Sequence, residues 1–515
     1  MKWADHWLGP WVLGALALVL AGASARPFAS SWNDGSRLAS VESLVARGTF
    51  CIDGSPFLDP PPSLSEGDHP PYDPSNSLLR AGTRDKLLID GWFYSDKPPL
   101  VSVPLAVAYR ALMFVGAPAP HERPDVFAWV VCVLLSGLGY AVAVGCMWAL
   151  GTRVGLAPRW RLVWLGAFAL ATVLPAYTRS ANSHIAQLGA VALTCVFVCR
   201  IAEDRRAWAS LFGAGFAAGF AYNLDFGVGP PFALAVTGIV ALRTRSACAV
   251  AACGLGMAPC VVAGHAINFA IGHDWLKPLN MHPEYLAWPG SPFETTMTGV
   301  VRTRYVAQGL YALDLLVGKK GFLTHNLPLL LAVTAWLKKK STPPAPPSLK
   351  GRGEIETSEP PGAGSIASGA NSFSPLPEGK GGSGGVGRLE LIALGLWCAA
   401  SWLLYGVLSK NHGGGCVSVR WFVPFLVPGF WLLARVLHER PEFRRDFLAL
   451  AGWGLVLAGS AWTAGPWWAR NVPLYWWVFG GSLLTWLVVR LAAPRVRVEP
   501  APAFLQPDPR RRRAA

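Results

Sequence analysis

Long apolar runs separated by short polar segments make up most of the chain. We take each run as a candidate for a helix that crosses the hydrocarbon core of a bilayer. The runs cover residues 7–25, 125–150, 162–177, 185–199, 208–223, 228–242, 247–271, 322–337, 389–408 and 422–437, and two more precede a basic C-terminal tail. The pattern predicts an all-α polytopic membrane protein with about twelve transmembrane helices.

One polar segment interrupts this pattern early in the chain. Residues 26–97 form a segment far longer than the loops that usually join neighbouring helices, so we expect this segment to have a function. The apolar stretch that follows, residues 98–116, contains Pro99, Pro104 and Arg110. These residues suit a shallow interfacial helix better than a membrane span. We therefore expect a long external first loop that carries short interfacial helices.

The basic residues of the short loops give the helices a direction. With residues 98–116 kept outside, the basic clusters all fall on one side, as the positive-inside rule requires of the cytoplasmic side. These clusters are Arg153, Arg159 and Arg161; Arg200, Arg205 and Arg206; Arg243 and Arg245; Lys338, Lys339 and Lys340; and Arg440, Arg444 and Arg445. The prediction is a multi-pass protein of the cytoplasmic (inner) membrane. Both termini are cytoplasmic, and loops 26–97 and 272–320 are outside.

Composition divides the chain into two membrane halves. Residues 1–337 form the N-terminal half and residues 389–493 the C-terminal helices. Residues 338–388 are rich in Pro, Gly and Ser, which predicts a disordered cytoplasmic linker, and residues 494–515 form a basic cytoplasmic tail. Ala23-Ser24-Ala25 also fits a signal-peptidase site, but the many spans that follow favour an uncleaved anchor.

The overall positive charge does not change the predicted class of protein. The 515-residue chain is 52% hydrophobic and 15% charged, with a formal net charge of +15. Its Lys and Arg residues sit in short clusters between apolar runs, where they orient helices. We therefore expect no nucleic-acid partner, and the lipid bilayer is the expected partner.

The external ends of the predicted helices collect most of the unusual polar residues. They are Asp34, Arg37, Asp96, Lys97, Asn182, His184 and Asp225, together with Lys410, His412 and Arg420 around a glycine run. A single Asp or His at a helix end is usually a cap, and a lysine there usually snorkels. Their common side of the membrane instead favours a site. Acids beside basic groups can deprotonate a hydroxyl and hold a phosphate leaving group.

Three motifs in the first loop resemble a known family. They are Asn33-Asp34-Gly35-Ser36-Arg37, Leu44-Val45-Ala46-Arg47-Gly48-Thr49-Phe50 and Tyr94-Ser95-Asp96-Lys97-Pro98-Pro99-Leu100. In this order they resemble the first external loop of the GT-C integral-membrane glycosyltransferases, in the ArnT-like and protein mannosyltransferase-like branch. The resemblance covers residues 7–245 well and the second half only as a general pattern.

The resemblance implies a GT-C-like fold and an enzyme that takes a sugar from a polyprenyl-phosphate-linked donor outside the cytoplasmic membrane. Asp34 would be the catalytic carboxylate, either as general base or as the group that orients the acceptor. Arg37, Asp96 and Lys97 match the family positions near the donor phosphate. From their sidedness we add Asn182, His184 and Arg420 as further donor-phosphate or substrate-binding residues. No family motif fixes the acceptor, which could be a lipid, a glycan or a protein.

The chain departs from the family pattern at two places. Relatives often carry a second acid after the first-loop Asp, whereas this chain has Gly35, so any role of that neighbour is lost. A Pro-rich insertion, residues 60–74, is expected to affect how the acceptor reaches the site.

Cofactors and alternative functions complete the prediction. Nothing is spaced like a structural zinc site, so we expect no protein-built metal site, although a divalent ion between phosphate and Asp34 remains open. The lipid-linked sugar donor is the expected ligand. The alternatives are a polytopic transporter and a non-catalytic component of cell-envelope polysaccharide assembly. Predicted span centres almost free of ionisable residues argue against ion-coupled transport.

Overall fold

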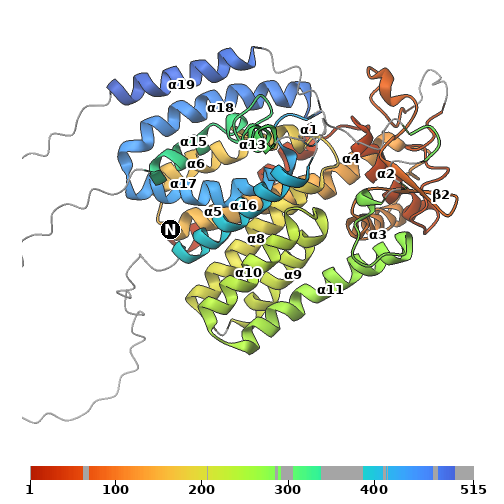
Figure 1. Ribbon diagram of the computed structural model, residues 1–515, viewed down its shortest axis with the longest axis horizontal. Helices are drawn as coiled ribbons and strands as arrows, with labels where there is room; N and C mark the ends of the chain where they lie inside the picture. The colour runs from red at the N-terminus through yellow and green to blue at the C-terminus, as the bar shows by residue number, and fades with distance from the viewer. Residues whose placement is uncertain are drawn as a thin grey trace, which may run out of the picture.

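The computed structural model describes residues 2–61, 69–205, 207–282, 284, 288–291, 305–337, 387–409, 413, 416–467 and 474–492. These residues are mostly helical (Figure 1). The predicted linker, 338–388, lies outside the described residues except for its last two, because the next helix begins at Arg388. The predicted tail, 494–515, lies wholly outside them.

The helices follow the apolar runs of the sequence. In the N-terminal half they are α1 (Lys2–Ser24), α2 (Trp32–Ala46), α3 (Ser102–Phe114), α4 (Pro124–Cys132), α5 (Leu138–Val154), α6 (Pro158–Leu170), α7 (Leu174–Tyr177), α8 (Ser183–Glu203), α9 (Trp208–Leu224), α10 (Gly229–Thr244), α11 (Ala247–Gly272), α13 (Tyr305–Asp314), α14 (Phe322–His325) and α15 (Pro328–Leu337). In the C-terminal half they are α16 (Arg388–Leu408), α17 (Leu426–Glu439), α18 (Arg444–Ala464) and α19 (Tyr475–Ala492).

Short irregular helices join several of these elements. The 3₁₀ turns are η1 (Ser77–Leu79), η2 (Pro99–Val101), η4 (Leu279–Met281), η5 (Arg420–Phe425) and η6 (Pro441–Phe443). The π-helical stretch η3 (Val133–Gly137) joins α4 to α5, so that both form one long rod.

The predicted count of about twelve membrane spans is not confirmed. Among the described residues, seven helical segments are long and apolar enough to cross a membrane. They are Pro124–Val154, Ser183–Glu203, Ala247–Gly272, Arg388–Leu408, Arg420–Glu439, Pro441–Ala464 and Tyr475–Ala492. The other predicted runs also fall on helices, but most are short: the run 162–177, for example, is broken between α6 and α7 near Pro175. The protein is a multi-pass membrane protein.

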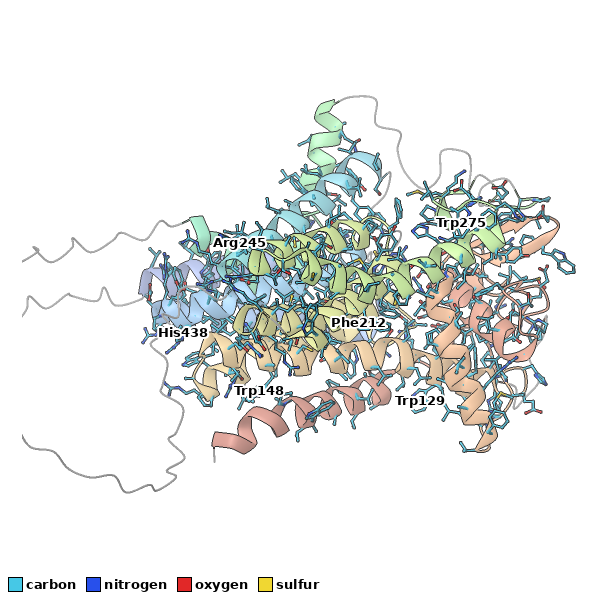
Figure 2. The ribbon with its side chains drawn as sticks, turned by 90° about the horizontal axis from the view of Figure 1, so that it is seen from below. Trp129, Trp148, Phe212, Arg245, Trp275 and His438 are labelled. Atoms are coloured by element: carbon cyan, nitrogen blue, oxygen red, sulfur yellow. The ribbon has the colours of Figure 1, made fainter. Side chains whose placement is uncertain are left out.

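The long first loop gathers at one end of the helical bundle. Figure 1 shows α2, β2 and α3 together there, while most long helices run away from them toward the other end. In Figure 2, Trp275, just beyond α11, lies at the same end as this loop, and Arg245 and His438 lie at the opposite end. The first loop therefore lies at the end of the bundle opposite Arg245 and His438. Which end faces the cytoplasm stays a prediction.

Helix α8 is the central helix and fixes the position of the site. It packs against α5, α9 and α10, and most of its side chains are buried. Glycines allow the closest contact, because a Cβ on Gly139 of α5 would lie 2.6 Å from the Ile185 carbonyl oxygen. A Cβ on Gly189 of α8 would likewise lie 2.6 Å from the Gly139 oxygen. This contact holds the N-terminal end of α8 deep in the bundle.

A β-hairpin in the first loop corrects the all-α prediction. Strands β1 (Lys86–Ile89) and β2 (Trp92–Ser95) pair antiparallel, with Ile89 opposite Trp92. Asp90 and Gly91 both have positive φ, of 52° and 83°, which is the geometry of a two-residue hairpin turn. The Asp-Gly pair between two apolar stretches is the sequence signal for this hairpin, and the interpretation as helices and loop overlooked it.

Candidate functional site

The start of α2 places three polar side chains in the interior. Ser31 caps the helix by accepting a hydrogen bond from the Asp34 backbone N–H at 3.1 Å. Asn33 and Asp34 follow on the first turn, and Arg37 lies one turn later, four residues after Asn33. All three side chains are buried. A buried helix with so many polar groups needs partners from other elements.

Asp34 uses its two carboxylate oxygens unequally. Oδ2 accepts hydrogen bonds from the Ser30 backbone N–H at 3.2 Å, the Ser30 hydroxyl at 2.9 Å and Trp467 Nε1 at 3.1 Å. Oδ1 is buried and has no hydrogen-bond partner. Burial raises the pKa of Asp34 above its usual value, although the Ser30 hydrogen bond and the charge of Arg37 oppose the shift.

Arg37 ties α2 to the N-terminal end of α8. Its Nη2 donates to the Ser183 hydroxyl at 2.9 Å, and its Nη1 donates to the carbonyl and side-chain oxygens of Asn33. Its Nε is buried without a partner. Burial, followed by repulsion from Arg420, lowers the pKa of Arg37 to about 10, so the guanidinium stays charged at neutral pH.

The hairpin delivers Lys97 between two carboxylates. Its Nζ lies 2.7 Å from Asp85 Oδ2 and 2.7 Å from Asp96 Oδ2. The other Asp96 oxygen accepts a hydrogen bond from the Ser36 hydroxyl of α2 at 3.1 Å. Burial raises the pKa of Asp96 despite the nearby Lys97. Burial also opposes ionisation of Asp85, but Lys97, Arg420 and Arg37 together outweigh it and lower the pKa of that carboxyl.

The start of α8 contributes Asn182 and His184. Asn182 caps the helix, since its Oδ1 accepts a hydrogen bond from the His184 backbone N–H at 2.9 Å. His184 is 4% exposed, and its Nδ1 has no hydrogen-bond partner. The nearest anionic group is Asp225, whose Oδ2 lies 3.7 Å from that Nδ1. Asn182 therefore acts as a cap, whereas His184 faces a carboxylate.

Arg420 enters the site from the C-terminal half, at the start of η5. Its guanidinium lies over the Trp467 ring, 5.5 Å from the ring centre. It has no hydrogen bond or ion pair to any residue in the described ranges, and its Nε is buried without a partner. Lys410 and His412, which the sequence placed beside it, lie outside the described residues.

These side chains meet at one cavity of about 300 Å³. Five predicted site residues line it: Arg37, Asp96, Lys97, His184 and Arg420. Asp34 and Asn182 are not among its lining residues. The walls come from α2, the end of β2 with η2, the start of α8, the end of α9, α11, the loop 276–281, α16 and η5. Residues from both halves of the chain are therefore needed to form it.

Four residues that the sequence did not single out as site residues complete the constellation. Asp225, directly after α9, accepts hydrogen bonds through Oδ1 from Gly227 N–H, Val228 N–H and the Tyr405 hydroxyl. Tyr405 of α16 lines the cavity with it, Asp85 holds Lys97, and Trp467 joins Asp34 to Arg420. Only Asp225 stood out in the sequence, as an acid at an external helix end. Within the described ranges, no three or more His, Cys, Asp or Glu side chains are grouped to hold a metal ion.

The comparisons with known proteins give two structural matches. No family model matches the sequence, and no curated protein matches it. The crystal structure of ArnT from Cupriavidus metallidurans bound to undecaprenyl phosphate matches with a TM-score of 0.43 and 12% identity, over 95% of this chain and 77% of the other. The apo structure of the same protein matches with a TM-score of 0.41 and 14% identity, over 95% and 76%. The structural comparison returns an ArnT, which belongs to the branch of the GT-C family that the sequence motifs resemble.

Proposed function

We propose that the protein is a membrane glycosyltransferase that moves a sugar from a polyprenyl-phosphate-linked donor to an acceptor at the outer face of the cytoplasmic membrane. The observation that carries this proposal is that Arg420 lines the cavity with a buried Nε that has no hydrogen-bond partner, and that it makes no close ion pair with any described residue. A half-buried guanidinium with an unsatisfied N–H donor gains free energy when a ligand anion accepts from that donor. The motifs of the first loop support the same reaction class.

The cations of the cavity suit the leaving phosphate. Arg420 offers an unpaired guanidinium, and Arg37 lies near enough to repel it, so both charges converge on one region. Arginine binds phosphate through paired N–H donors, and fixed donors stabilise the charge that develops as the sugar–phosphate bond breaks. Lys97 adds a point charge that Asp85 and Asp96 hold in place.

The apolar part of the cavity suits a polyprenyl chain. Leu404 and Leu408 of α16 line it on one side, and Leu276 and Met281 line it near the end of α11. Leu408, Leu276 and Met281 are 65%, 75% and 51% exposed, so the apolar lining continues onto the outer surface of the bundle. Apolar surface that runs from a cationic pocket to the outside fits a ligand with an anionic head and a hydrocarbon tail.

Asp34 serves the donor side of the site in this proposal. It lies outside the cavity lining, but its Oδ2 holds Trp467, on whose ring Arg420 rests. Its charge also stabilises the guanidinium of Arg37. Asp34 therefore positions the two arginines that bind the phosphate. The role of catalytic carboxylate that the family resemblance implies for Asp34 stays a prediction, which the kinetics of Asp34→Asn would test.

The test is donor turnover by purified protein in nanodiscs. A panel of radiolabelled polyprenyl-phospho-sugars is supplied with total membrane lipid extract as the acceptor source, and the variant is Arg420→Ala. We expect label to move to a new product with wild type and the rate to fall about 100-fold in the variant, because a charge at the leaving phosphate is lost. The matched control is Arg123→Ala, which removes an arginine that is paired with Asp125 and does not line the cavity. No transfer from any donor by wild type would refute the proposal.

A further inference from the structure

The wall of the cavity made by α8, α9 and α16 carries a carboxylate with one occupied and one open oxygen. Asp225 Oδ1 accepts from Gly227 N–H at 2.9 Å, Val228 N–H at 3.0 Å and the Tyr405 hydroxyl at 2.5 Å. Within the described part of the chain, no hydrogen bond reaches Oδ2. Asp225 is 8% exposed and lines the cavity. Hydrogen bonds from the protein hold Oδ1 in place, and Oδ2 is available to a ligand in the cavity.

His184 supplies a second, independent sign that this wall takes a ligand. It is 4% exposed, lines the same cavity, and has a buried Nδ1 without a hydrogen-bond partner. That Nδ1 faces Asp225 Oδ2 at 3.7 Å, which is too long for a hydrogen bond. Catalytic hydrogen bonds are often long in an empty site and shorten when substrate binds. Contraction of this distance would orient Oδ2 without further rearrangement.

We propose that Asp225 is the general base that accepts the proton of the acceptor hydroxyl, with Tyr405 and His184 as its positioning residues. This inference rests on the proposed function and deepens it. As the acceptor O–H proton passes to Asp225 Oδ2, the acceptor oxygen forms a bond to the anomeric carbon of the sugar. The bond from that carbon to the phosphate oxygen breaks, and its electron pair leaves with polyprenyl phosphate, whose charge the arginines hold.

The chemistry of a single carboxylate base favours a hydroxyl over an amine as the acceptor group. Most amines exist as ammonium at neutral pH, and an ammonium nitrogen has no free electron pair with which to attack the sugar. A hydroxyl is uncharged and keeps its electron pairs. It also needs a base, because it becomes a good nucleophile only as its proton leaves.

The acidity of Asp225 matches this task. Burial raises its pKa to about 6, although the Tyr405 hydrogen bond, the backbone N–H groups and Arg420 oppose the shift. A base with a pKa near the working pH combines a large ionised fraction with a strong pull on the proton. The titratable and charged groups that face it are His184 from α8, Tyr405 from α16 and Arg420 from η5.

The pH dependence follows with a definite sign. The carboxylate is the active form, so kcat should fall about tenfold for each pH unit below about 6. Because the Tyr405 hydroxyl lowers the pKa of Asp225, Tyr405→Phe should move this acid limb to higher pH. A merely structural role for Tyr405 would lower the amount of folded protein and leave the position of the limb unchanged.

The decisive variant is Asp225→Asn. An asparagine oxygen can still accept from Gly227, Val228 and Tyr405, so the local fold is kept while the base is lost. With the donor panel and lipid extract described above, we expect kcat to fall at least 100-fold. The Kd for polyprenyl phosphate, measured by direct binding, should stay within about twofold of wild type. Blocking only the amines of the lipid extract should leave wild-type transfer intact.

A matched control exists in the loop after α11. Asp274 accepts from the N–H groups two and three residues ahead, Leu276 at 2.8 Å and Lys277 at 3.0 Å, just as Asp225 does. It does not line the cavity, so Asp274→Asn should transfer at the wild-type rate. Wild-type kcat in Asp225→Asn would overturn the inference and leave the proposed function standing. Loss of transfer on amine blocking would overturn the choice of a hydroxyl, and absence of any transfer by wild type would overturn both proposals.

Discussion

At the scale of single residues, the site gives different surroundings to Asp34, the catalytic carboxylate that the family resemblance implies, and to Asp225. Asp34 is fully enclosed and engages Ser30 and Trp467, whereas Asp225 reaches the cavity through one oxygen. Neither carboxyl has its usual acidity, because burial raises the pKa of both. Access to the cavity therefore distinguishes them better than acidity does. The two roles predict different kinetic defects.

Asp34→Asn should weaken donor binding more than it slows the chemical step. The substitution removes the charge that supports Arg37 and weakens the acceptor for the indole N–H of Trp467, beneath Arg420. We expect KM for the polyprenyl-phospho-sugar to rise about tenfold, equivalent to about 1.4 kcal/mol, with a smaller change in kcat. Steady-state kinetics over a range of donor concentrations measure both. A collapse of kcat at unchanged donor affinity would instead make Asp34 the catalytic base and refute that role for Asp225.

At the scale of elements, Gly35 explains one departure from the family pattern. It lies on α2 between Asp34 and Ser36, where a Cβ would be only 2.0 Å from the Tyr72 hydroxyl. Tyr72 is buried, and its hydroxyl donates to the Phe57 carbonyl, so displacing this side chain would cost free energy. A second acid after Asp34 is therefore excluded by packing in this chain. Helix α2 is held against the rest of the first loop at this point.

Gly35→Ala should lower the stability of the protein and the activity together. Overpacking against Tyr72 costs about 1–3 kcal/mol and pushes α2, which carries Arg37, away from the cavity. The measurement is the midpoint of thermal unfolding in detergent, followed by donor turnover. Gly238→Ala is the control, because this glycine of α10 has nothing within 4 Å of an added Cβ. An unchanged unfolding midpoint in Gly35→Ala would contradict this prediction, because it would show that the loop around Tyr72 can rearrange without loss of stability.

The helices and part of the candidate site could be predicted from the sequence. Apolar runs and basic clusters predicted the helices and brought Arg37, Lys97, His184 and Arg420 to one end of the bundle. They could not show which way each side chain turns: Asn182 caps α8 and does not line the cavity. The sequence could not reveal the roles of Asp85 and Tyr405 for another reason. Their partners, Lys97 and Asp225, lie 12 and 180 positions away, and only the tertiary fold brings each pair together.

At the scale of the whole molecule, an ion pair with one buried partner joins the two halves at a distance from the cavity. Glu390, near the start of α16, is fully buried and bonds Arg243 at the end of α10 at 2.6 and 2.8 Å. It also accepts from the Gly387 backbone N–H at 2.9 Å, which fixes the first turn of α16. This pair helps to set the position of α16, and with it Tyr405, relative to the N-terminal half.

Glu390→Gln should destabilise the whole assembly of helices. Removing the carboxylate deprives the half-buried guanidinium of Arg243 of this negative charge, and because solvent still reaches that group we expect a cost of about 1–2 kcal/mol. We expect a lower unfolding midpoint in detergent and partial recovery when Arg243→Gln is added. The control is Glu439→Gln in the more exposed pair with Arg435, which should change little. A single variant as stable as wild type would show that α16 is held by apolar packing alone.

The hydrogen bond between Asp34 and Trp467 spans 433 positions of sequence, and this has a consequence for biosynthesis. A chain that emerges from the ribosome and enters the membrane N-terminus first acquires its Asp34 carboxylate long before the indole that engages it. Throughout that interval Arg420 and its supporting ring are also missing. For the proposed glycosyltransferase, this means that a nascent chain has no complete phosphate-binding site until Arg420 and Trp467 have been synthesised.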